Sequence, residues 1–330
     1  MGYERIEKGF MNKLYIVMYH YVRNLKGSRY PEIKGLDYVL FKKQIQFFSE
    51  NFHVVTMEDI IHYYTEGYPL PPNALLLTFD DGYIDNYTYV WPVLLQYKMQ
   101  GSFFVPAKTF RENCLLDVNK IHFILASASI GELCKELYEQ LDYYRGGKWN
   151  YPSNQELFHE YAVANRFDTK ETIFFKRILQ AILPEELRGI ISSNIFKKYV
   201  GISEDVMAQE LYMNYDQMKV IKRQGGFFGI HGYNHYWMNR LEKNKLIEDI
   251  DLALDSMGEL VNKKQWVVNY PYGSYSSGVI QSIQGKGCVL GLSTDVAVAN
   301  LEKNNRFSLP RLDTNDFPPK SKNFQLVVNN

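Results

Sequence analysis

Short apolar runs rich in β-branched or aromatic residues alternate along the chain with stretches in which apolar residues recur every three or four positions. The first pattern is typical of buried strands and the second of amphipathic helices. The predicted strands are residues 14–19, 74–79, 101–106, 227–230, 266–270 and 288–293, and the predicted helices between them include 38–51, 57–66, 90–97, 245–262 and 278–286. Strands that alternate with helices indicate parallel pairing in a βα architecture.

The middle of the chain, from about residue 110 to 222, departs from this alternation. It has few strand candidates, and segments such as 130–143 and 170–182 carry apolar residues at helical spacing. We therefore expect a helical insertion between two halves of one βα domain. The predicted parts are a discontinuous domain of residues 12–110 and 222–318, an insertion of residues 111–221 and a C-terminal tail of residues 319–330.

The composition favours a packed globular protein. Hydrophobic residues make up 46% of the 330 positions and charged residues 22%. Lys+Arg and Asp+Glu both number 37, and a net charge of zero argues against a general nucleic-acid binder, which needs a basic face. The 26 Tyr and 20 Phe are expected mainly in the core, although some rings are candidates to line a carbohydrate cleft.

The cysteines and the N-terminal segment indicate the cellular compartment in which the protein is expected. Cys114, Cys134 and Cys288 form no C-x-x-C pair, and their odd number argues against a disulfide framework. The sequence shows no signal-peptide cleavage pattern, and no apolar run approaches the roughly 18 residues of a membrane span. These features predict a cytoplasmic protein without a membrane span.

Polar residues gather where the predicted strands end. The polar residues in this position are Asp80, Asp81, His231, His235, Tyr272 and Arg311. Because the C-terminal ends of parallel strands meet at the active-site end of a βα barrel, we expect these side chains to share one site.

The two aspartates and two histidines suggest a metal site. Adjacent carboxylates at the end of a buried strand repel each other, and a cation removes that cost, although Asp80-Asp81-Gly82 is also good turn chemistry. His231 and His235 are four residues apart, a spacing that on a helical turn places both rings on one face. Two imidazoles and one carboxylate leave an open position on an ion, as in catalytic zinc sites. We therefore predict a divalent ion, with zinc expected, bound by Asp81, His231 and His235.

Three segments resemble motifs of the polysaccharide deacetylases, the group with a NodB-like domain (carbohydrate esterase family 4). They are residues 78–82 (TFDDG), 231–235 (HGYNH) and 270–273 (YPYG), and residues 18–20 (MYH) and 101–104 (GSFF) also match stretches common in such proteins. The resemblance covers about residues 12–110 and 222–315. It implies an irregular (β/α) barrel, with fewer strands than the eight of a regular barrel.

The resemblance also implies a role for each matching residue. Asp80 would be the general base and Arg311 would orient it, while Tyr272 would donate its backbone N–H to the oxyanion. The divalent ion, commonly zinc in the family, would be held by Asp81, His231 and His235. The implied reaction removes an acyl group, expected to be acetyl, from a sugar nitrogen.

The chain departs from the family pattern in several places. No histidine follows His235, whereas many relatives place an acid histidine near the C-terminus. The general acid is therefore left open between protonated Asp80, His122 or His159 of the insertion, and a metal-held water. Gly232 stands where Ser or Thr is usual, and the arginine often found before the third motif is absent. The insertion explains why 150 residues separate the two metal motifs.

The predicted function is metal-dependent deacetylation of an N-acetylated sugar in surface polysaccharide biosynthesis. A cytoplasmic location points to a nucleotide-linked or lipid-linked intermediate as substrate. The alternatives are a deformylase or amidase on the same fold, and a carbohydrate-binding relative that has lost its activity. The insertion leaves a strand end, so it is expected either as a lid over the substrate or as a packing or dimerisation element, which leaves a homo-oligomer open.

Overall fold

The computed structural model describes residues 13–165, 168–322 and 324, and the chain divides into two compact units. Unit 1 comprises residues 1–24, 35–114 and 209–330, and unit 2 comprises residues 25–34 and 115–208. The predicted insertion, 111–221, differs from unit 2: it lacks residues 25–34, and it includes residues 111–114 and 209–221, which lie in unit 1. Of the predicted tail, only residues 319–322 and 324 are among those described.

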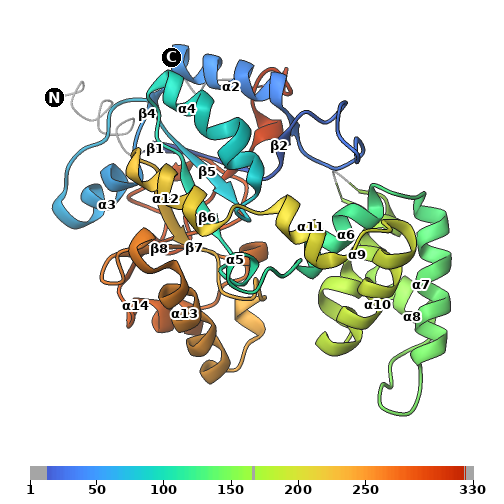
Figure 1. The fold of residues 1–330 in the computed structure, drawn as a ribbon. Helices are drawn as coiled ribbons and strands as arrows, with labels where there is room; N and C mark the ends of the chain where they lie inside the picture. Colours follow the sequence, from blue (N-terminus) through green and yellow to red (C-terminus); the bar gives the residue numbers. More distant parts are fainter. Residues whose placement is uncertain (1–12, 166–167, 323, 325–330) are drawn as a thin grey trace. The chain divides into compact units, whose positions relative to one another are not determined.

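A mostly parallel sheet forms the centre of unit 1 (Figure 1). Its strands are β1 (Lys13–Tyr19), β4 (His53–Val54), β5 (Ala74–Asp80), β6 (Ser102–Val105), β7 (Phe227–Ile230), β8 (Trp266–Asn269), β9 (Cys288–Leu292), β10 (Ala299–Asn300) and β11 (Leu312–Asp313). The order is β10-β1-β5-β6-β7-β8-β9, with β11 on β1 and β4 on β5. The pairing of β1 with β10 is antiparallel, and the other described pairings in this sheet are parallel. A separate two-stranded sheet pairs β2 (Val22–Arg23) with β3 (Leu36–Asp37).

The segment just before and within β11 connects the two ends of the curled sheet. The N–H of Ser293, next to β9, donates to the carbonyl of Leu309 at 2.9 Å. A few residues later, Leu312 lies opposite Val17 of β1 in a parallel register. This segment therefore bridges β9 to β1, and the C-terminal ends of the strands form a ring.

Helices pack against both faces of this sheet (Figure 1). They are α2 (Tyr38–Asn51), α3 (Met57–Glu66), α4 (Trp91–Tyr97), α5 (Lys108–Arg111), α12 (Tyr215–Arg223), α13 (Lys243–Met257) and α14 (Ser277–Gln284). Side-chain caps set several of their starts; for example, Thr56 and Asp59 form a capping box at α3. The predicted strands and helices are confirmed to within a few residues, except that a π-helix, Asn86–Val90, precedes α4.

Both faces of the sheet are buried, which explains the continuous apolar runs in the sequence. One face of the sheet, which carries Val17, Phe79 and Phe103, packs against the helices α2, α4, α13 and α14. The helices contribute Phe41, Leu94, Ile250 and Ile283 to this core. The opposite face carries Ile16, Leu76, Phe104 and Leu290. These side chains pack with Leu309 and with Ile60 of α3.

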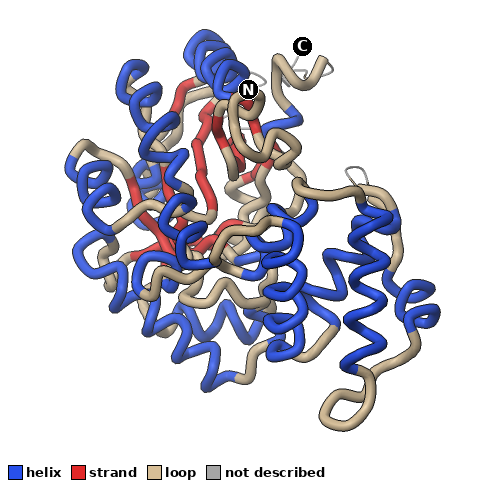
Figure 2. Tube along the Cα trace, turned by 45° about the vertical axis from the view of Figure 1, so that its right-hand side comes forward, coloured by secondary structure: helices blue, strands red, loops and turns tan. Residues whose placement is uncertain are grey.

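Unit 2 consists of helices joined by loops (Figure 2). They are α6 (Asp117–Leu125), α7 (Ile130–Tyr144), α8 (Asn154–Tyr161), α9 (Lys170–Arg177) with its π-helical continuation Ile178–Ile182, α10 (Glu185–Tyr199) and α11 (Glu204–Leu211), in which the division from unit 1 falls. Helix α10 packs against α6 and α7. Segment 25–34 joins this unit through Tyr30, whose ring meets that of Phe123 edge-on at 4.9 Å. In the parts of the chain that are described, no helix combines the length and apolar character that crossing a membrane requires.

Candidate active site

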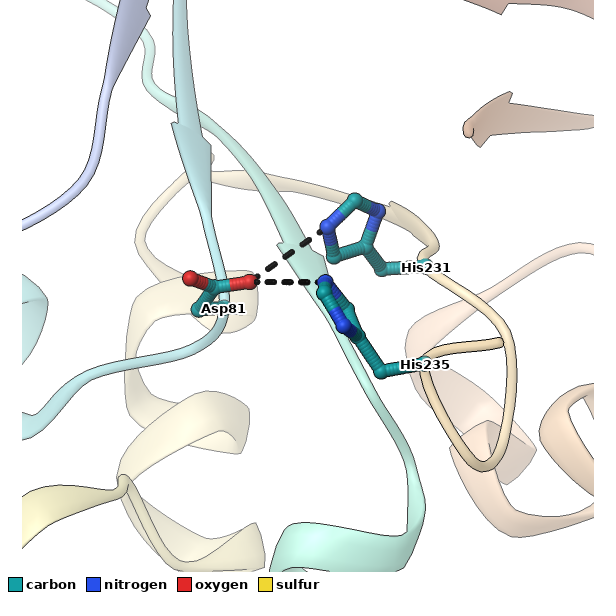
Figure 3. A group of neighbouring side chains, drawn as sticks. All are labelled: Asp81, His231 and His235. Carbon is teal, nitrogen blue, oxygen red and sulfur yellow. Dashed lines mark ion pairs between the residues drawn. The ribbon is translucent and has the colours of Figure 1, made fainter. Parts of the chain in front are cut away.

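Asp81, His231 and His235 come together in unit 1 (Figure 3). Asp81 directly follows β5, and the two histidines belong to the loop after β7. The Nε2 atoms of His231 and His235 each lie 3.4 Å from Oδ1 of Asp81, and one possible ligand atom from each residue lies within 4.8 Å of the others. All three side chains are buried. The predicted ligand set therefore forms a compact candidate metal site.

The two histidines do not meet on a helical turn, so that part of the prediction is wrong. They lie on an irregular loop in which Gly232 and His235 adopt left-handed conformations, with φ of 70° and 59°. Asp249 of α13 holds this loop, because its carboxylate accepts two consecutive backbone N–H groups at 2.9 and 3.0 Å. The loop brings the ring of His235 to within 4.8 Å of the ring of His231, centroid to centroid.

The hydrogen bonds of this cluster fit a bound cation. Nδ1 of His231 lies 2.6 Å from the carbonyl oxygen of Asn269, and a carbonyl only accepts, so Nδ1 carries the proton. In the neutral form that metal binding requires, the Nε2 lone pair of His231 faces Oδ1 of Asp81, a buried atom that makes no hydrogen bond with the described residues. Two lone pairs in a buried position are unfavourable unless a cation lies between them. The donor set of one carboxylate and two imidazoles therefore fits a divalent ion.

Asp80 has a different environment from its neighbour Asp81. Nη1 and Nη2 of Arg311 bind its two carboxylate oxygens, each at 2.9 Å, and Nδ2 of Asn269 donates to Oδ1 at 2.6 Å. Arg311 is held in turn by the carbonyl of Ser293, at 2.8 Å from Nε. Asp80 is 2% exposed and Arg311 1% exposed, so the structure places the predicted orienting arginine in a buried, two-pronged ion pair.

Burial and charged neighbours together set the ionisation of the site. Burial would raise the pKa of Asp80, but Arg311 and His20 outweigh it and the pKa lies below its ordinary value. Burial would likewise raise the pKa of Asp81, yet the two imidazoles hold it well below the ordinary range. Burial lowers the pKa of His235, an effect that Asp81 only partly offsets. Ionised carboxylates beside a neutral imidazole are the forms that bind a metal ion.

His20 is a site residue to which the sequence analysis assigned no role. It follows β1, and because Tyr19 pairs with Phe79 in the parallel register, His20 is level with Asp80. Its Nε2 lies 3.8 Å from Oδ2 of Asp80, and its side chain is 40% exposed. The sequence signal for His20 is its position at a strand end, directly after the apolar run of residues 14–19.

Tyr272 lies in the short 3-10 turn after β8 with a left-handed φ of 59°. Its ring contacts that of His235 at 4.7 Å, and the indole of Trp237 stacks on it at 4.4 Å with the planes 5° apart. The turn requires a glycine next, because a Cβ at Gly273 would come 2.1 Å from the hydroxyl of Thr294. Tyr272, which was predicted as a site residue, thus packs against the loop that carries His231 and His235. Trp237, which stacks on it, was not predicted from the sequence.

A family model for polysaccharide deacetylases matches residues 67–140 and 197–290, which together make up about half of the chain. The chain belongs to the polysaccharide deacetylase family. The resemblance found in the sequence is thereby confirmed. Both aspartates, both histidines and Tyr272 fall inside the matched segments, whereas His20 and Arg311 lie outside them.

Relatives of known name support the family assignment. A putative polysaccharide deacetylase of Bacillus subtilis, YxkH, is 30% identical over 98 residues, which are 29% of this chain and 33% of that protein. This chain therefore matches about a third of the length of that relative.

Solved deacetylases share the fold. The Streptococcus pyogenes deacetylase PplD, in complex with acetate, has a TM-score of 0.55 at 16% identity, covering 91% of this chain and 92% of that chain. IcaB from Ammonifex degensii has a TM-score of 0.54 at 17% identity, covering 91% of each chain. The deacetylase domain of BpsB from Bordetella bronchiseptica has a TM-score of 0.52 at 14% identity, covering 92% of this chain and 96% of that chain. The likeness confirms the predicted irregular (β/α) barrel of the polysaccharide deacetylase type.

Proposed function

We propose that this protein is a divalent-metal-dependent hydrolase that removes the acetyl group from the nitrogen of an N-acetylated sugar. Membership of the polysaccharide deacetylase family supports the reaction class. The observation that carries the proposal is the difference between two adjacent carboxylates. Asp80 is bound on both oxygens by Arg311, whereas Asp81 turns an unpaired oxygen towards two imidazoles.

Asp80 is the proposed general base. Its pairing with Arg311 keeps it ionised and fixes its orientation, so that it can take a proton without binding the ion itself. When bound by Asp81, His231 and His235, the ion would supply Lewis-acid polarisation of the acyl carbonyl and lower the pKa of a nearby water. Zinc is the expected ion, because imidazole and carboxylate ligands with an open position suit it.

His20 is the proposed general acid, which replaces the late histidine of many relatives. The side chain is partly exposed and its Nε2 lies beside Asp80, so it can donate a proton to the amine nitrogen that leaves. The backbone N–H of Tyr272 is the proposed donor to the developing oxyanion, and the packing of Tyr272 against His235 supports that placement. His122 and His159 lie on α6 and α8 of unit 2, and their role, like that of the insertion as a lid, stays a prediction.

The proposed substrate is a sugar unit of a surface polysaccharide or of its nucleotide-linked or lipid-linked precursor. The acetate in the PplD complex supports acetyl as the group removed. The cytoplasmic location that favours a precursor over a finished polymer stays a prediction.

The deciding experiment measures metal content and product release on the purified full chain. We expect close to one divalent ion per chain, and acetate release from N-acetylglucosamine oligomers or from UDP-N-acetylglucosamine that a chelator abolishes and zinc restores. Formate release from N-formyl analogues alone would favour the deformylase alternative. Zinc-loaded protein that binds these sugars without hydrolysing them would favour the inactive carbohydrate-binding relative.

A further inference from the structure

The second oxygen of Asp81 has a partner that the proposed reaction does not use. The hydroxyl of Tyr83 donates to Oδ2 of Asp81 at 2.6 Å, a short bond of the charge-assisted kind. Tyr83 is fully buried, and the hydrogen bond leaves Oδ1 as the oxygen that faces the two histidines. The phenol therefore determines which oxygen of the carboxylate points at the ion site.

Two other segments of the chain, one with Tyr21 and one with Tyr212 and Met213, hold the phenol in place. The ring of Tyr83 lies nearly parallel to that of Tyr21, with centroids 4.0 Å and planes 15° apart, and to that of Tyr212, at 6.2 Å and 11°. The backbones of Tyr83 and Tyr212 form an antiparallel bridge, and the N–H of Met213 donates to the carbonyl of Gly82 at 2.9 Å. A donor fixed in this way imposes its geometry on Asp81 rather than adapting to it.

Gly82 makes the short connection between Asp81 and Tyr83 possible. Asp81 and Gly82 both have left-handed φ, 69° and 68°, so the chain turns back and brings the Tyr83 hydroxyl under the Asp81 carboxylate. A Cβ at Gly82 would also come 2.6 Å from a methyl of Val105. The turn after β5 is thus built to join the metal carboxylate to a buried phenol.

We propose that Tyr83 is a positioning residue of the metal site, which presents Asp81 to the ion through Oδ1 alone and fixes its orientation. The inference rests on the proposed function, in that Asp81 is a metal ligand. Groups that hydrogen-bond to metal ligands typically change metal affinity by about 10- to 100-fold when they are removed, because the ligand loses its preset orientation. Without the hydroxyl, both oxygens of Asp81 are unsatisfied and the carboxylate can rotate.

Tyr83→Phe tests this proposal because it removes the hydroxyl and keeps the stacked ring. The zinc Kd, measured by competition with a chromophoric chelator, should rise about 10- to 100-fold. The visible spectrum of the cobalt-substituted protein should also change, because the coordination of Asp81 changes.

Tyr19→Phe is the matched control, since Tyr19 is equally buried and its hydroxyl donates to Gln44 at 2.8 Å. Tyr19→Phe should lose about as much thermal stability as Tyr83→Phe, but its zinc Kd and cobalt spectrum should match those of the wild type. Tyr83→Phe that binds zinc as tightly as the wild type, with the same cobalt spectrum, would overturn the positioning role alone. A wild-type protein that binds no divalent ion would instead overturn the proposed function.

Discussion

Arg311 binds both carboxylate oxygens of Asp80, with two contacts of 2.9 Å, although 231 positions of sequence separate the two residues. The amide of Asn269 donates to the same carboxylate and accepts from the same guanidinium, at 2.6 and 3.0 Å. The pair lies inside the barrel with almost no exposure. A fork-shaped cation is needed here, because a single ammonium cannot meet both oxygens in this geometry.

Replacing Arg311 by Gln should leave Asp80 protonated, and so unable to act as the base, up to a higher pH. Burial raises the pKa of Asp80 and Arg311 lowers it, so loss of Arg311 moves the pKa upward. The acid limb of the kcat/KM profile should shift to higher pH, and unfolding in urea should show a loss of about 3–5 kcal/mol. Arg311→Lys, which keeps the charge, should shift the limb less; a limb that stays in place in both variants would mean that Arg311 does not control the base.

The acid role of His20 can be separated from the role predicted for the insertion. His20→Gln should lower kcat by about 10²- to 10⁴-fold without changing the zinc Kd, because it removes a proton donor that is not a ligand. The double change His122→Gln, His159→Gln should leave kcat near that of the wild type. The reverse pattern would place the general acid in unit 2, on His122 or His159.

Neighbouring aspartates should respond differently to the same substitution. Asp80→Asn should keep stoichiometric metal and lose turnover, because it removes the base. Asp81→Asn should weaken metal binding, as should replacement of His231 and His235 together by Ala. Metal analysis after dialysis, combined with acetate release, measures both properties; equal metal affinity in the two Asn variants would contradict this division.

Asp249 should be a stability determinant of the metal loop. Its carboxylate accepts the N–H groups of Tyr233 and Asn234, so Asp249→Ala leaves two partly buried donors without this partner, at a cost of about 3 kcal/mol. The same substitution should raise the zinc Kd, because the loop that carries His231 and His235 is held less firmly. Asp251→Ala on the same helix is the control: that side chain is 51% exposed and pairs with Lys286, so its loss should cost under about 1 kcal/mol. Equal unfolding free energies for the two variants would refute the loop-holding role.

Much of the barrel could be predicted because its strands are buried on both faces. Such strands are continuous apolar runs, as in residues 74–79, and their ends are marked by the first polar residues. The ends then identify the site, since parallel strands bring Asp80 and His231 to one edge. This is why the ligand set could be assembled from the sequence without knowing the loops.

The rest depends on backbone conformation and on long-range packing, which periodicity does not report. The four-residue spacing of His231 and His235 suggested a helix, but a left-handed residue at position 235 produces the same proximity. His20 escaped notice because its relation to Asp80 arises from strand pairing, not from spacing in the sequence. Segment 25–34 joins unit 2 through contacts such as the Tyr30–Phe123 ring pair, which the sequence does not signal.

The place of β11 in the ring has a consequence for how the protein is made. Asp80 leaves the ribosome long before Arg311 has been translated, and the segment that carries Arg311 also completes the hydrogen bonding between β9 and β1. Until that segment arrives, a nascent chain holds an acidic pair with no guanidinium to neutralise it, and the burial of Asp80 is opposed. We therefore expect the catalytic end of the barrel to assemble only once the segment with Arg311 is available, and shorter translation products to contain the family motifs without the ion pair that orients Asp80.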